Sequence, residues 1–107
     1  FKVRDAWASA DSRFHIALAE ASQNPLLAIL IEILVGIAWQ QRSATEDPIN
    51  EEQIRTATAQ HRAITQTIAA RSPEQAHRLM LEHLESTRSH VQTQPEGLQR
   101  LIQLQLL

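Results

Sequence analysis

The chain has 107 residues and a mass of 12.1 kDa, the size of one small domain. Hydrophobic residues make up 43% of it and charged residues 21%, as in globular proteins that fold around a core. A net charge of −2 argues against nucleic-acid binding through bulk positive charge. The absence of cysteine excludes disulfides and thiolate metal sites, and the absence of GxGxxG and GxxxxGK(S/T) motifs excludes the common phosphate-binding loops.

The apolar periodicity predicts helices along most of the chain, beginning with one from about Arg4 to Ser22. The apolar residues of its predicted face recur at spacings of three and four: Trp7, Ala10, Phe14, Leu18 and Ala21. Asn24 and Pro25 are typical of the N-cap and first position of a second helix, which extends to about Arg42. This second helix is apolar nearly all round, so we expect it in the core or in a subunit interface.

A polar loop is predicted over residues 43–49, and Asn50 is the expected cap of a third helix ending near Arg71. Ser72 and Pro73 repeat the start signal for a fourth helix, which reaches about residue 92. The apolar residues predicted to face inward on these helices are Ile54, Ala57, Ile64, Ile68, Ala76, Leu79, Met80, Leu84 and Val91. The sequence therefore predicts an all-α fold, an antiparallel helical bundle.

No segment resembles a targeting signal or a membrane span. The longest apolar run, from Leu26 to Trp39, contains Glu32, and a membrane span needs roughly 20 apolar residues. The missing initiator methionine suggests that the chain is cut from a longer protein. After a Pro-Glu-Gly break at residues 95–97, the leucine-rich tail over residues 98–107 is expected to form a terminal helix that docks on the body or on a partner.

Four titratable side chains fall on faces that the periodicity assigns to the interior, namely Asp11, His15, His61 and His83. A buried carboxylate without a partner is costly, and one divalent metal would satisfy all four groups. Three imidazoles and a carboxylate suit Zn²⁺, Ni²⁺, Mn²⁺ or Fe²⁺. The alternative is that the histidines are ordinary core residues bonded to carbonyls and that Asp11 and His15 form a local i,i+4 helix pair.

The other two histidines, His77 and His90, are expected at the surface or in an interface. His77 lies at the flank of the apolar face of the fourth helix. His90 shares a face with His83, but it lies roughly 10 Å further along the helix, which is too far for one mononuclear site.

Residues 11–26, DSRFHIALAEASQNPL, resemble the D-x-x-F-H…A…N-P-L signature of the FCD domain. This is the C-terminal, effector-binding domain of the FadR-type subfamily of GntR transcription regulators. Residues 60–64, QHRAI, resemble its H-x-x-I segment, and residues 76–84, AHRLMLEHL, its A-x-x-x-M-x-x-H-L helix. The resemblance covers roughly residues 7–87.

The resemblance implies that Asp11, His15, His61 and His83 bind a divalent metal, with zinc the first choice, inside the helical bundle. It also implies that a small carboxylate or hydroxy acid binds at or beside this metal. Effector binding would then change how a cytoplasmic, dimeric regulator engages DNA. Arginine side chains available to meet such an effector are Arg13, Arg62 and Arg78.

This chain departs from the family's pattern in two respects. It lacks the winged helix-turn-helix domain and the helical sequence that precedes the D-x-x-F-H helix, so DNA would be bound only through a domain missing from these residues. The turn Arg71-Ser72-Pro73 stands where the family usually carries a Gly-Asp type pair, a local change expected to leave the metal unaffected. We therefore interpret residues 1–107 as an effector-binding and oligomerisation domain.

Two other classes of function stay open. A metal-dependent hydrolase could use an open coordination position to activate water. The acidic residues nearest to the role of general base, Glu20 and Glu32, are however better interpreted as surface or interface residues, so no enzymatic activity is expected. The third possibility is a metal-free helical dimerisation module.

Overall fold

The computed structural model describes the backbone of residues 2–45 and 51–92 and the side chains of residues 6–37 and 51–89. These residues form four helices and no strand, which confirms the all-α prediction; the helices are α1 (Lys2–Ala21), α2 (Pro25–Thr45), α3 (Glu51–Ala69) and α4 (Pro73–Gln92).

The predicted helix boundaries agree with the structure to within a few residues, except at the end of α2. The loop predicted over residues 43–49 is wrong for residues 43–45, which continue α2. Ser43-Ala44-Thr45 contains no helix-breaking residue, and the first proline after it is Pro48. The predicted Asn50 cap and the tail over residues 98–107 lie outside the described residues.

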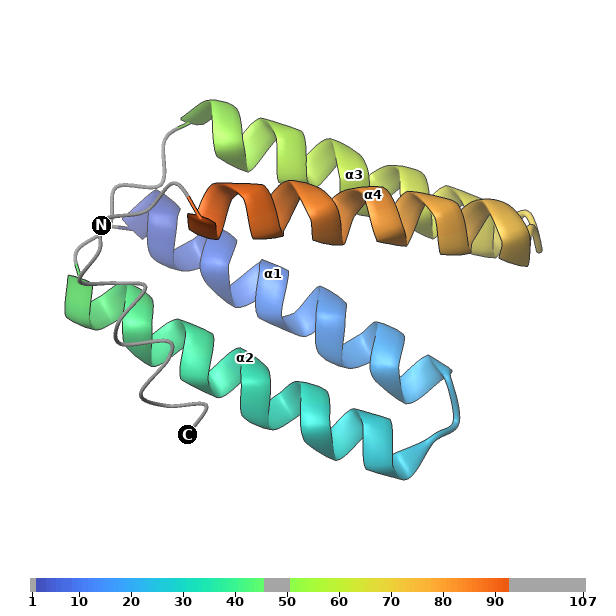
Figure 1. Ribbon diagram of the computed structural model, residues 1–107, viewed down its shortest axis with the longest axis horizontal. Coiled ribbons are helices and arrows are strands. Elements are labelled where there is room, and N and C mark those ends of the chain that lie inside the picture. Colours follow the sequence, from blue (N-terminus) through green and yellow to red (C-terminus); the bar gives the residue numbers. More distant parts are fainter. Residues whose placement is uncertain (1, 46–50, 93–107) are drawn as a thin grey trace. The chain divides into compact units, whose positions relative to one another are not determined.

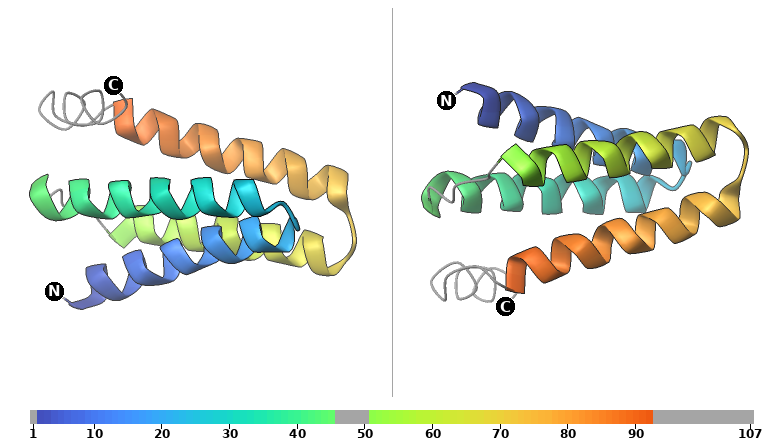
Figure 2. Two further views of the ribbon diagram at one scale, coloured as in Figure 1. Left: turned by 90° about the horizontal axis from the view of Figure 1, so that it is seen from below. Right: turned by 90° about the horizontal axis from the view of Figure 1, so that it is seen from above.

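The four helices divide into two compact units, one containing α1 and α2 and the other α3 and α4. Each unit is an antiparallel hairpin, in which a turn of three residues connects helices lying side by side (Figures 1 and 2). Because such a connection is short, the two helices that it joins lie next to each other. Among the described helices, none has the length and apolar character needed to cross a membrane.

Hydrogen bonds at the turn between α1 and α2 explain why one helix ends and the next begins there. Gln23 has a positive φ of 60°, which stops α1. Asn24 Oδ1 accepts hydrogen bonds from the backbone N–H groups of Leu26, at 3.1 Å, and Leu27, at 3.3 Å. Asn24 is therefore the predicted N-cap of α2, with Pro25 at the first helical position, where a missing N–H costs nothing.

The turn between α3 and α4 is a Schellman motif. The N–H of Arg71 donates to the carbonyl of Ile68 at 3.0 Å, and the N–H of Ser72 donates to the carbonyl of Thr67 at 2.9 Å. Arg71 adopts a φ of 56°, a left-handed conformation that glycine tolerates better than any residue with a Cβ. The departure from a glycine-containing turn at Arg71-Ser72-Pro73 thus places a strained residue at this position.

Replacing Arg71 with glycine is expected to raise the free energy of unfolding by about 0.5–1 kcal/mol, because the relieved left-handed strain exceeds the entropy that glycine adds to the unfolded chain. Denaturant unfolding followed by circular dichroism measures the change. Arg71→Ala removes the same charge but keeps a Cβ, so this control should show no gain. A similar gain in both variants would assign the effect to charge rather than to backbone strain.

The inward faces predicted for α3 and α4 are confirmed over part of their length. Ile64 on α3 is fully buried and His83 on α4 is only 4% exposed. Ile68 and Leu84, predicted to face inward, are exposed instead. Leu84 directly follows the buried His83, and successive residues of a helix point about 100° apart, so the inward stripe passes through His83 and leaves Leu84 outside.

The predicted inward face of α1 is confirmed in part, since Trp7, Phe14 and Leu18 are half-buried. Among the described side chains of α1, Ala8 and Ala19 are buried, whereas Ala10 and Ala21, which were predicted to face inward, are exposed. The residues that lie between the two buried alanines on the same side include Asp11, Ser12 and His15, all half-buried. Asp11 and His15 therefore lie on the inward side of α1, as predicted.

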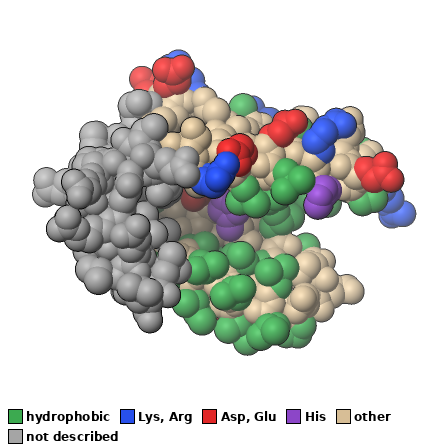
Figure 3. Space-filling view, viewed as in Figure 1, with side chains coloured by type: hydrophobic (Ala, Val, Ile, Leu, Met, Phe, Trp, Pro, Cys, Tyr) green, Lys and Arg blue, Asp and Glu red, His purple; other side chains and the backbone are tan. Residues whose placement is uncertain are grey.

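α2 is exposed on much of its surface. Its most exposed large side chains are Leu26, Ile29, Leu30 and Ile33, which are 50–74% exposed. Figure 3 shows apolar side chains gathered at the surface of this helix. Ala28, Ile31 and Val35 are half-buried on another side. The expectation that α2 lies in the core is therefore wrong for the first group, which leaves the expectation of an interface.

Candidate metal centre

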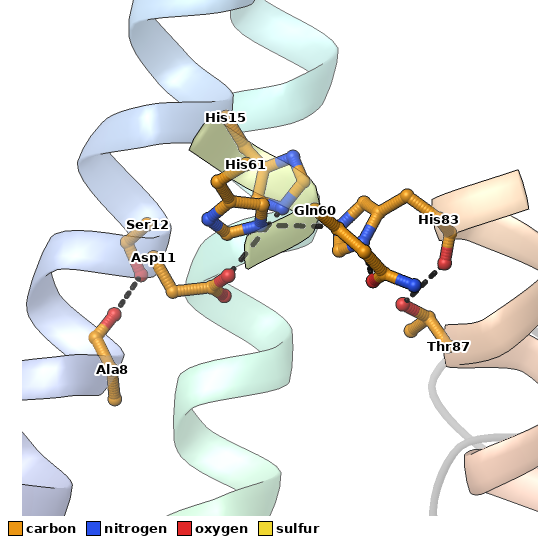
Figure 4. A network of polar contacts seen from close by, with 8 residues as sticks. All are labelled: Ala8, Asp11, Ser12, His15, Gln60, His61, His83 and Thr87. Atoms are coloured by element: carbon orange, nitrogen blue, oxygen red, sulfur yellow. Dashed lines mark hydrogen bonds and ion pairs between the residues drawn. The ribbon is translucent and has the colours of Figure 1, made fainter. Parts of the chain in front are cut away.

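His61 of α3 and His83 of α4 meet in the second unit, although 22 residues separate them in the sequence. Their Nε2 atoms are 3.2 Å apart, and the rings approach edge to face with centroids 4.7 Å apart. His61 is half-buried and His83 is buried. The hairpin thus directs two potential ligand nitrogens toward each other, as Figure 4 shows.

The opposite side of the His83 ring contacts a residue that the sequence analysis did not single out. The Nδ1 atom of His83 lies 2.6 Å from Oε1 of Gln60, the residue directly before His61 on α3 (Figure 4). Gln60 falls three residues after Ala57 and four before Ile64, so it shares their helix face. A polar amide on that predicted apolar face was the signal available in the sequence, but its partner can be identified only from the packing of α4 against α3.

Asp11 and His15 form the second pair, on one face of α1 in the first unit. The Nε2 atom of His15 lies 3.5 Å from Oδ1 of Asp11, and the side chains are 23% and 17% exposed respectively. The Phe14 ring meets the His15 ring edge to face, with centroids 5.1 Å apart. The i,i+4 spacing predicted this neighbourhood, but 3.5 Å exceeds the usual length of an N–H···O hydrogen bond.

The remaining candidate side chains lie at the surface where the structure describes them. His77 is exposed, as expected, and the side chain of His90 lies outside the described residues.

The candidate effector-binding arginines Arg13, Arg62 and Arg78 are all exposed. Glu20 and Glu32, considered as general bases, are exposed as well.

Two exposed ion pairs lie elsewhere on the second unit. Arg55 Nη2 lies 3.1 Å from Glu51 Oε1, and Arg88 makes two hydrogen bonds to Glu85, of 2.6 and 3.1 Å. The hydrogen bond from Arg88 lowers the pKa of the Glu85 carboxyl. Exposed pairs of this kind contribute little to stability, and they involve none of the candidate metal ligands.

Comparison with known proteins identifies the family. The model of the FCD domain matches residues 2–86, so the chain belongs to the FCD domain family. The chain is also 39% identical over 90 residues to a protein of Mycobacterium gastri assigned as an HTH-type transcriptional regulator, RmpR. That alignment covers 78% of this chain and 31% of the relative, so the chain spans about a third of the relative's length. No solved structure matches the chain.

Proposed function

We propose that this chain is the ligand-sensing domain of a GntR regulator of the FadR-type subfamily, and that Asp11, His15, His61 and His83 together bind one divalent metal. The approach of the two Nε2 atoms of His61 and His83 to 3.2 Å carries this proposal. The family match and the name of the similar regulator support its regulatory part.

The His61–His83 distance fits two ligands of one metal ion. Nitrogens bound to zinc lie about 2.0–2.1 Å from the metal, so a 3.2 Å separation corresponds to an angle of about 100° at the metal. That value lies between the octahedral and tetrahedral angles. A hydrogen bond between the two rings would also give 3.2 Å, which is the metal-free alternative.

The Asp11–His15 pair adds a carboxylate and a third imidazole. At 3.5 Å the two atoms are too far apart for a strong hydrogen bond, but they too are compatible with ligands of a common ion at an angle of about 115°. His₃Asp is a borderline donor set that suits zinc best among the available metals, with nickel, manganese and iron as alternatives.

The proposed ligand is a small carboxylate or hydroxy acid. Four protein ligands leave one or two coordination positions of a bound metal open, and an anionic oxygen would bind there. The exposed Arg13, Arg62 and Arg78 are candidates to neutralise its charge. Binding would favour one arrangement of the helices over another, and its differential affinity for the two sets the size of the response.

We further propose that this response controls DNA binding by a full-length dimer through a helix-turn-helix part outside these 107 residues. The name of the M. gastri relative and the third of its length that the chain spans support this division.

The metal content of the purified protein tests the proposal. About one equivalent of a divalent metal per chain by elemental analysis, without hydrolysis of generic esters or phosphates, is the expected result. Stoichiometric metal accompanied by hydrolysis would favour a metal-dependent hydrolase. A protein that neither retains metal nor binds added Zn²⁺ or Ni²⁺ would be a metal-free helical module, and the proposal would be wrong.

The exposed apolar surface of α2 favours association with a second copy of the chain, since large apolar patches commonly mark interfaces. Replacing the exposed Ile33 with glutamate is expected to weaken a dimer by about tenfold or more, because the carboxylate would be buried without a partner. Light scattering over a concentration series measures this. Glu32→Gln, a change at the neighbouring exposed position, is the matched control. A dimer unaffected by Ile33→Glu would exclude this face.

A further inference from the structure

The imidazole of His83 is held at both of its nitrogens by consecutive residues of α3. Its Nε2 lies 3.2 Å from Nε2 of His61, and its Nδ1 lies 2.6 Å from Oε1 of Gln60. The ring is only 4% exposed, so water has little access to replace either contact. The orientation of this ring therefore depends on α3 as much as on α4, from which it projects.

The contact with Gln60 determines which nitrogen of His83 carries the proton. An amide oxygen only accepts hydrogen bonds, so the His83 Nδ1–H is the donor. A neutral imidazole has one N–H, and its Nε2 therefore presents a lone pair. That lone pair is directed to the side of the ring on which His61 lies, and it is the form of the nitrogen that a metal binds.

We propose that Gln60 is a positioning residue for the metal site, which holds His83 as the Nδ1–H tautomer and fixes the direction of its Nε2 lone pair. This inference rests on the proposed metal-binding function. Histidines bound to metals commonly donate their second N–H to an acceptor that sets the tautomer and the ring orientation. Gln60 supplies this acceptor without adding a charge beside the His61–His83 pair.

The position of Gln60 suits this role because it is adjacent to His61. A single turn of α3 carries one proposed ligand and the acceptor that orients the other, so a rotation of α3 would disturb both at once.

Replacing Gln60 with methionine keeps the size of the side chain but removes the acceptor. Replacing it with glutamate keeps an acceptor oxygen at the same reach. Gln66, exposed on the same helix, offers a control substitution to methionine.

Two measurements on the protein test the inference. Long-range ¹H–¹⁵N correlation spectra of the metal-free protein should give His83 a protonated Nδ1 and an unprotonated Nε2. This pattern should be lost in Gln60→Met and retained in Gln60→Glu. Competition titrations of Zn²⁺ against a chromophoric chelator should show affinity lowered by about 10–100-fold in Gln60→Met. Gln60→Glu and Gln66→Met should bind Zn²⁺ as the unsubstituted protein does.

The outcomes separate the two proposals. A Gln60→Met variant that remains helical by circular dichroism and binds Zn²⁺ with unchanged affinity overturns the role of Gln60 and leaves the metal site standing. A proton on Nε2 of His83 in the metal-free, unsubstituted protein overturns the tautomer assignment. An unsubstituted protein that binds no Zn²⁺ overturns the metal site, and with it the role of Gln60 in that site.

Discussion

Replacing His83 with alanine is expected to abolish retention of a divalent metal, lowering its affinity by more than about 100-fold. Loss of a group that merely orients a ligand already costs about 10–100-fold, and His83 is proposed as a ligand itself. The substitution would also leave His61 without the ring nitrogen now 3.2 Å from its Nε2. Elemental analysis of the purified variant and a Zn²⁺ competition titration measure the effect.

The controls for this experiment come from the same chain. His77→Ala removes an exposed imidazole from the same helix and is expected to leave metal binding unchanged. Because His83 is buried, its loss could unfold the hairpin, so Asp11→Asn provides a second test on a different helix, at a half-buried position. Metal retained by both His83→Ala and Asp11→Asn would contradict the proposed ligand set.

Zn²⁺ is expected to stabilise the folded protein strongly. At a free metal concentration about 1,000 times the dissociation constant, linkage adds about 4 kcal/mol to the free energy of unfolding. For a domain of this size, that gain corresponds to a rise in Tm of roughly 15 °C or more. The gain should shrink as the pH falls from about 7.5 to about 5.5, because a protonated imidazole cannot bind a metal. Thermal unfolding with added Zn²⁺ and with a chelator measures the difference.

The proposed ligand variants show whether this stabilisation arises at the predicted site. Zn²⁺ should raise the Tm of His77→Ala as it does that of the unsubstituted protein, and it should leave the Tm of His61→Ala nearly unchanged. An equal rise in His61→Ala would mean that Zn²⁺ binds elsewhere, for example at exposed histidines or carboxylates. No rise in the unsubstituted protein would favour the metal-free helical module, in which the histidines are ordinary core residues.

The two pairs of proposed ligands differ in how far the sequence could predict them. Asp11 and His15 are one helical turn apart, so the local geometry of α1 is enough to make them neighbours. His61 and His83 could be assigned to inward faces, but their approach to 3.2 Å depends on how α3 and α4 pack and on their relative register. The role inferred for Gln60 also required the second helix, because the acceptor and the ring that it orients lie 23 residues apart.

Local signals in the sequence determined where the helices lie. Helices start at Asn24-Pro25 and at Pro73 because capping by Asn24 and the fixed φ of proline operate within one turn. Burial depends instead on which side of each helix another element covers. Ile68, Leu84 and much of α2 are as apolar as the residues that become buried, yet they remain exposed. Periodicity ranks the sides of one helix by polarity, whereas only packing between helices decides which of them is covered.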